Sequence, residues 1–138
     1  MPHISYSELK DWVFCAFYHK LTRVDKLSGF KGNEYTAFGS AMHSVCEKKL
    51  LHEDVNDEFF VQEFEKNLDS LDDDVVLKEN LIYDMMGQGK KIIPEIEDAL
   101  NNYFDKGYEV LFVEMPLMEP IEGEPDYKFK GYIDAVVL

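Results

Sequence analysis

The pair His43 and Glu47 combines residue types and a spacing that could support chemistry. The two residues are four apart in a segment whose apolar residues recur at helical spacing, so both side chains would lie on one face of a helix. Imidazole and carboxylate groups can hold a divalent metal ion or transfer a proton. The same spacing also occurs on ordinary amphipathic helices, in which His43 and Glu47 would be a surface pair without a catalytic function.

Two acids in apolar surroundings near the end of the chain, Asp134 and Glu114, could supply further metal ligands. Asp134 lies within residues 131–138 (GYIDAVVL) and Glu114 within residues 111–115 (LFVEM). An ionised carboxylate in such a run is costly unless it binds a cation or is hydrogen-bonded. Carboxylates on adjacent strands can hold Mg²⁺ or Mn²⁺, with His43 completing the shell, and the ion would activate water for phosphodiester hydrolysis. In the alternative interpretation, each acid is a strand residue that faces solvent.

Helical periodicity extends over most of the first hundred residues. The segments with this pattern are residues 6–21, 36–51, 57–71, 75–86 and 92–104. Ser5 and Glu8 have the spacing of a capping box at the start of the first segment. Gly87, Gly89 and Pro94 interrupt the last two segments, and the pattern leaves open whether these are two helices or one kinked helix.

The pattern changes to that of a β-hairpin after Gly107. Residues 108–117 are rich in β-branched and aromatic residues, residues 122–126 (EGEPD) have turn composition, and residues 127–137 alternate. Helices followed by strands predict one α+β domain over residues 1–138. Because a lone hairpin is marginally stable, we expect it to belong to a central sheet that is incomplete at Leu138.

Composition limits the classes of protein that the sequence can represent. A chain of 138 residues with 46% hydrophobic residues fits one globular domain with one core. No apolar run approaches the ~20 residues needed to span a bilayer, so no membrane role is expected and the expected location is the cytoplasm. The two cysteines, Cys15 and Cys46, have no metal-ligand spacing and are expected to be small buried hydrophobic residues.

Charge is distributed unevenly along the chain. The net charge of −14 argues against general binding to nucleic acid, because that affinity comes mainly from Lys and Arg. Residues 10–31, however, carry five basic side chains against two acids, whereas residues 53–84 carry twelve acids against two basic side chains. This asymmetry predicts one face that tolerates a polyanion and another that does not.

Taken together, these segments resemble PD-(D/E)XK nucleases of the RecB type, a group that includes Cas4-like and many phage exonucleases. The resemblance spans essentially the whole chain. It rests, in chain order, on residues 5–9 (SYSEL), 15–18 (CAFY), 38–43 (FGSAMH), 113–114 (VE) and 130–134 (KGYID). The blocks that contain His43 and Asp134 are its specific parts.

The resemblance implies a Mg²⁺- or Mn²⁺-dependent DNA exonuclease with a restriction-endonuclease-like fold. His43 and Asp134 match metal ligands of the family, and Glu114 matches a frequent acidic position of the active site. The basic region would then guide the DNA strand through Lys20, Arg23 and Lys31. Some members also hold an iron–sulfur cluster through one early and three late cysteines, of which Cys15 matches only the early one.

The sequence departs from the family pattern at its end. Family members continue into a strand with Glu/Asp-x-Lys and a helix with Gln and Tyr, whereas this sequence stops at Leu138. We therefore expect the N-terminal part of a nuclease, inactive alone because a ligand and the water-positioning lysine are missing. One alternative is a non-catalytic, nuclease-like regulatory module whose acidic middle contacts a basic protein. Another is that a second copy completes the sheet by strand swapping or oligomerisation.

Overall fold

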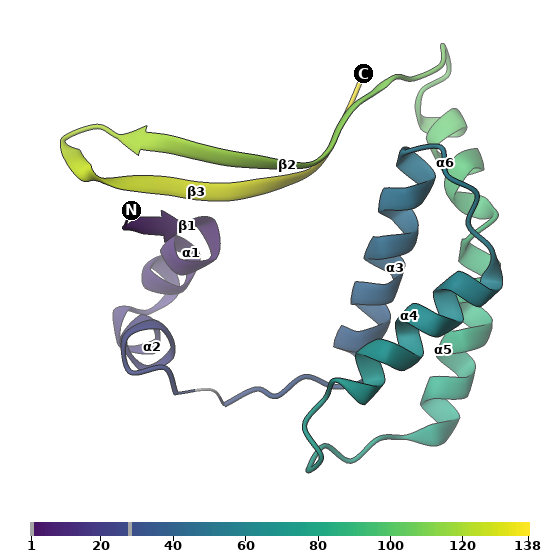
Figure 1. The fold of residues 1–138 in the computed structure, drawn as a ribbon, viewed down its shortest axis with the longest axis horizontal. Helices are drawn as coiled ribbons and strands as arrows, with labels where there is room; N and C mark the ends of the chain where they lie inside the picture. The colour runs from purple at the N-terminus through teal and green to yellow at the C-terminus, as the bar shows by residue number, and fades with distance from the viewer. Residues whose placement is uncertain (1, 28) are drawn as a thin grey trace. The chain divides into compact units, whose positions relative to one another are not determined.

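The computed structural model describes residues 2–27 and 29–138, and these form two compact units. Unit 1 combines Met1–Phe30 with Glu114–Asp134, and unit 2 combines Lys31–Val113 with Ala135–Leu138. The predicted α+β class is confirmed, because the described part of the chain contains six α-helices and a three-stranded mixed sheet (Figure 1). None of the described helices is long and apolar enough to cross a membrane.

Unit 1 begins with a short strand and a broken helical segment. The elements are β1 (His3–Ser5), α1 (Tyr6–Phe14), α2 (Ala16–His19) and the π-helix η1 (Lys20–Val24). Only the Ser5 half of the predicted capping box is confirmed, since the Glu8 amide donates to Ser5 Oγ at 3.1 Å while the Glu8 carboxylate lies against His19. The prediction of one helix over residues 6–21 is wrong, because Cys15 has an extended backbone (φ −166°, ψ 115°) that ends α1 and begins α2.

The sheet has the strand order β1-β3-β2. The predicted hairpin is confirmed as β2 (Val110–Ile121) and β3 (Glu124–Val137), and Gly123 supplies a positive φ of 83° at the turn. Pro116 and Pro120 are tolerated in β2 because β2 is an edge strand. The parallel pairing of β1 with β3 was not predicted, and it makes Ser5 and Lys130 register partners.

Unit 2 is built around the longest helix, α3 (Glu34–Leu50). The other helices are α4 (Asp57–Asp69), α5 (Glu79–Ile92) and α6 (Glu95–Tyr103), and α3 packs against all three. Phe60 and Phe64 of α4 are fully buried, and their rings lie 5.8 Å apart. Phe38 of α3 meets both rings edge-on at 5.8–5.9 Å, so an aromatic cluster joins the two helices.

The glycine and proline residues of the predicted fourth and fifth helices act differently. Helix α5 starts at Glu79 and continues through Gly87 and Gly89, and the break before α6 falls at Pro94, so there are two helices. Gly89 is required by packing, because a Cβ at this position would lie 2.2 Å from Cζ of Phe60. A Cβ at Gly87 would meet nothing within 4 Å.

The buried carboxylate of Glu34 connects the start of α3 to the start of α5. Its Oε1 accepts the backbone N–H of Lys78, the N-cap residue of α5, at 2.5 Å. The pKa of Glu34 is lowered, first by its own backbone amide and then by that of Lys78, and these effects outweigh the opposing effect of burial. The ionised carboxylate therefore stabilises this junction.

Gly89→Ala should destabilise unit 2, because the added methyl group would overlap the Phe60 ring. We expect the free energy of unfolding to fall by about 1–3 kcal/mol, the range for overpacked cores. Gly87→Ala, in the same helix, is the matched control and should stabilise by roughly 0.5–1 kcal/mol. Urea denaturation followed by circular dichroism measures both, and equal effects of the two substitutions would contradict the close contact with Phe60.

Glu34→Gln should remove a pH-dependent part of the stability. Because the folded pKa lies below the ordinary value of 4.5, the carboxylate stabilises the fold above that pH and loses its effect as pH falls through the folded pKa. The stability difference between wild type and Glu34→Gln should therefore be full near neutrality and shrink in acid. Urea midpoints measured across this pH range test it, with exposed Glu65→Gln as the control. A constant difference at all pH values would refute the effect.

Candidate metal and nucleic-acid site

His43 and Glu47 lie on the side of α3 that is not buried in the core. The helix starts with a capping box between Asn33 and Thr36, and its buried side carries Ala37, Ala41 and Val45. His43 and Glu47 are 46% and 33% exposed, and His43 Nε2 lies 2.7 Å from Glu47 Oε1. The predicted position of both residues on one helix face is confirmed.

The pair has the donor set of a metal ligand group. Both residues offer ligand atoms that could hold a metal ion, a His nitrogen and a carboxylate oxygen. Two neighbouring ligands of one ion, each about 2.0–2.2 Å from it, lie roughly 3 Å apart, which is close to the present separation. In a second arrangement, Glu47 would accept a hydrogen bond from the N–H of one ring nitrogen, which would fix the tautomer of His43 and direct the other nitrogen to the ion.

Glu114 has the most unusual backbone of the predicted site residues. It lies in β2, is half-buried, and has a φ of 52°. This left-handed conformation costs a non-glycine residue roughly 1–2 kcal/mol, and residues in such conformations are concentrated at functional sites. The strain is an independent reason to regard Glu114 as a functional residue.

Asp134 lies in β3 and is exposed. The buried surroundings expected for this carboxylate are not found, since its neighbour Ile133 is also 36% exposed. Asp134 therefore needs no cation to offset burial. His43 belongs to unit 2 and Asp134 to unit 1, and the meeting of their side chains at one ion stays a prediction.

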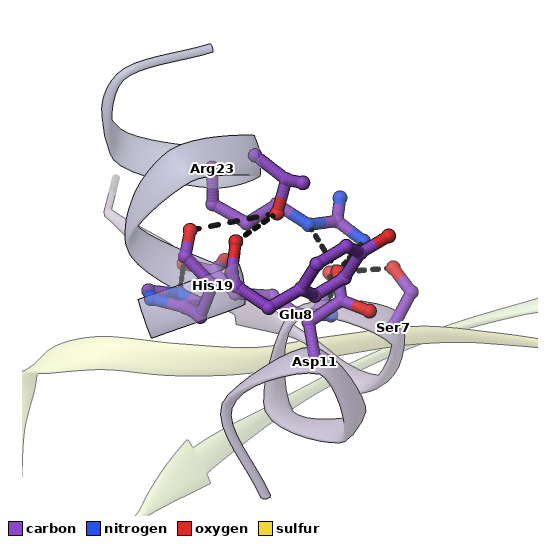
Figure 2. Close-up of polar contacts among 8 residues, drawn as sticks. Ser7, Glu8, Asp11, His19 and Arg23 are labelled. Carbon is purple, nitrogen blue, oxygen red and sulfur yellow. Dashed lines mark hydrogen bonds and ion pairs between the residues drawn. The ribbon is translucent and has the colours of Figure 1, made fainter. Parts of the chain in front are cut away.

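The three basic residues expected to contact DNA are each next to an acid. Arg23 donates from Nε and Nη2 to Asp11 at 2.7 Å (Figure 2). Lys31 pairs with Asp72 and Asp74, and Lys20 lies 3.9 Å from Asp25. Because these acids offset much of the positive charge, the three side chains would have to exchange partners to bind phosphate.

A polar contact between α1 and α2 was missed from the sequence. Glu8 Oε1 lies 3.0 Å from His19 Nε2, and His19 is only 15% exposed (Figure 2). The ring of Trp12 meets the imidazole edge-on at 5.4 Å. Glu8 was interpreted only as part of a capping box. Its contact with His19 requires the break at Cys15, for which the sequence gave no signal.

The two cysteines have different environments. Cys46 is half-buried on α3, whereas Cys15 is exposed at the break between α1 and α2, so the expectation that both are buried is wrong for Cys15. Burial raises the pKa of the Cys46 thiol, and the neighbouring Glu47 carboxylate raises it further. A thiol with a raised pKa is a poor metal ligand near neutrality, so we do not include Cys46 in the candidate metal group.

Cys46 should react more slowly with a disulfide reagent than Cys15, because less of it is thiolate and less of it is exposed. Near pH 8 we expect a difference of about tenfold or more. The rates are measured in Cys15→Ser and Cys46→Ser variants, each of which leaves one thiol. Glu47→Gln, combined with Cys15→Ser, should raise the rate of Cys46. A Cys46 rate equal to that of Cys15 would contradict this assignment.

Comparison with known proteins identifies the family. The model of the PD-(D/E)XK nuclease superfamily matches residues 3–137, a range that contains His43, Glu114 and Asp134. No curated protein and no solved structure matches the chain. Because the family match extends over nearly the whole sequence, the chain belongs to the PD-(D/E)XK nuclease superfamily.

Proposed function

We propose that this protein is a metal-dependent DNA nuclease of the exonuclease type. The observation that carries the proposal is the family match over residues 3–137. Membership of the superfamily points to phosphodiester hydrolysis, to DNA as the substrate and to a divalent metal as the cofactor. The relation to RecB-type and Cas4-like enzymes belongs to the proposal and is supported by the blocks at residues 38–43 and 130–134.

The proposed ligands are His43, Glu114 and Asp134. Support comes from the His/Glu group that could hold a metal ion and from the strained backbone of Glu114. A bound Mg²⁺ or Mn²⁺ would supply an activated water and neutralise charge on the phosphate. Glu47 would hold the His43 ring in one tautomer, which supports the ligand role of the other ring nitrogen.

The remaining parts of the proposal concern the substrate. The proposed DNA contacts are Lys20, Arg23 and Lys31. Each side chain would exchange its acidic partner for a phosphate oxygen of the DNA. Such an exchange depends strongly on salt, because both the ion pairs and the phosphate contacts are screened. Activity should therefore be measured at low ionic strength.

His43→Ala and Asp134→Asn should each lower the rate of nucleotide release by about a hundredfold or more, because each removes a ligand of the ion. The assay uses end-labelled DNA with Mn²⁺ and a protein that includes the Glu/Asp-x-Lys strand, because the 138-residue chain is expected to be inactive alone. The matched controls are His52→Asn, a histidine outside the proposed site, and Asp126→Asn, on the same strand as Asp134.

Mn²⁺ binding, measured by the loss of the free-ion electron spin resonance signal, gives a second readout for the same variants. Binding should weaken in His43→Ala and Asp134→Asn and stay unchanged in the controls. Cleavage that survives both substitutions at the wild-type rate would show that these residues do not form the active site.

A further inference from the structure

A hollow of about 380 Å³ lies in unit 1 where the N-terminal strand meets β3. We call it the β1–β3 hollow, and its lining includes His3, Ser5, Tyr6, Ser7, Lys130 and Tyr132. It exists because β1 pairs in parallel with β3, which places Ser5 beside Lys130, and because α1 begins directly after Ser5. The chain thus brings hydroxyl, ammonium and aromatic groups together from segments more than 120 residues apart.

Lys130 differs from the basic residues that pair with acids. Within the described part of the chain, neither Lys130 nor its neighbour on the strand, Lys128, is in an ion pair, whereas Arg23 and Lys31 are. Lys130 Nζ lies 5.8 Å from the centre of the Tyr132 ring. An ammonium group without a carboxylate partner keeps its full charge for a ligand, and phosphate is a ligand that lysine commonly binds.

The hydroxyl groups beside Lys130 can extend a phosphate contact. Ser5 Oγ accepts the Glu8 amide at 3.1 Å and lies 3.1 Å from Ser7 Oγ. The Ser5 and Ser7 hydroxyl hydrogens are not both used in that contact, so at least one remains to donate to a phosphate oxygen. Serine hydroxyls and lysine ammonium groups are typical contacts to nucleic-acid backbones.

Two exposed tyrosines flank the polar groups. Tyr6 and Tyr132 are 65% and 59% exposed, so both rings are accessible to a ligand. Aromatic rings beside a basic groove provide stacking surfaces for unpaired bases. Bases in a duplex are already stacked and paired, so only an unpaired nucleotide could use both the phosphate contact and the tyrosine rings.

The strand that carries Lys130 also carries a proposed metal ligand. Successive side chains of a strand point to opposite faces, so Lys128, Lys130, Tyr132 and Asp134 occupy alternate positions on the same face of β3. The four residue-to-residue steps from Lys130 to Asp134 span about 13 Å. A DNA strand held at Lys130 would therefore have its next nucleotides within reach of Asp134.

We propose that the β1–β3 hollow is a binding subsite for an unpaired nucleotide, with its phosphate at Lys130 and the serine hydroxyls and its base against Tyr6 or Tyr132. This inference rests on the proposed nuclease function and adds a subsite that holds a single strand beside the metal ligand.

The test is fluorescence anisotropy of a labelled oligo-dT strand and of a blunt duplex, in EDTA so that no cleavage occurs. Wild type should bind the single strand about tenfold more tightly than the duplex. Lys130→Gln should weaken single-strand binding several-fold and lower the salt slope by about 0.7, the value for one lost phosphate contact on single strands. The Tyr6→Leu/Tyr132→Leu double variant should weaken it by about fivefold or more.

Matched controls are Lys66→Gln and Tyr83→Leu, an exposed lysine and an exposed tyrosine of unit 2, which should bind like wild type. Lys130→Arg should retain binding, which separates loss of charge from loss of folding. An unchanged affinity and salt slope in Lys130→Gln would overturn the subsite. Equal binding of duplex and single strand, with no effect of the tyrosine substitutions, would overturn the unpaired base.

This experiment separates the subsite from the proposed nuclease function. If single-strand binding depends on Lys130 but cleavage does not depend on His43 and Asp134, the subsite is supported and the proposed active site is rejected. If cleavage depends on His43 and Asp134 but single-strand binding does not depend on Lys130 or the two tyrosines, the active site is supported and the subsite is rejected.

Discussion

The packing of Phe60 and Phe64 against α3 is the constraint on which unit 2 depends. Both rings are fully buried, and Phe38 contacts them from α3. Removing a buried phenylalanine side chain costs about 3–5 kcal/mol, a large share of the stability of a small domain. Phe60 also reaches α5, which can approach only because position 89 has no side chain. One ring therefore sets the positions of three helices.

This packing determines which side of α3 carries the candidate metal ligands. Small buried residues, Ala37, Ala41 and Val45, allow α4 to lie close to α3. The helical period then leaves His43 and Glu47 on the opposite, accessible side. A candidate metal group thus sits on the most firmly anchored helix, which limits the movement of its ligand atoms and favours a defined coordination geometry.

The ion pairs, more than the net charge of the chain, determine where positive charge is available to a ligand. Of the many acids, Glu34 is used inside the structure, and several others neutralise Arg23 and Lys31 at the surface. Exposed pairs of this kind contribute little to stability, but they reduce the positive potential that DNA would meet. What remains for a polyanion is positive charge without an acid partner, and Lys130 is one such group in the described part of the chain. The overall acidity therefore permits a local nucleic-acid site without favouring general DNA binding.

The sequence by itself determined the features that depend on neighbours along the chain. Helical periodicity and the cap at Ser5 are local, so the α+β class, the hairpin and the shared face of His43 and Glu47 could be predicted. The ends of the predicted helices were less accurate, because the helix predicted over residues 75–86 is α5 (Glu79–Ile92). The break at Cys15 was missed because the local sequence carries no signal for it, and the contact of Glu8 with His19 that accompanies it joins residues 11 apart. The exposure of Asp134 could not be predicted from the local sequence either, because it depends on which other parts of the chain pack against β3.

Only the tertiary structure decided which distant groups meet. Glu34 and Lys78 are 44 residues apart, and Ser5 and Lys130 are 125 apart, so no spacing rule joins either pair. The N-terminal strand is three residues long and has no distinct pattern, and it forms because β3 offers it an unpaired edge. Local sequence sets the conformation of a segment, but the partner of its hydrogen bonds and charges is fixed only when the chain folds back on itself.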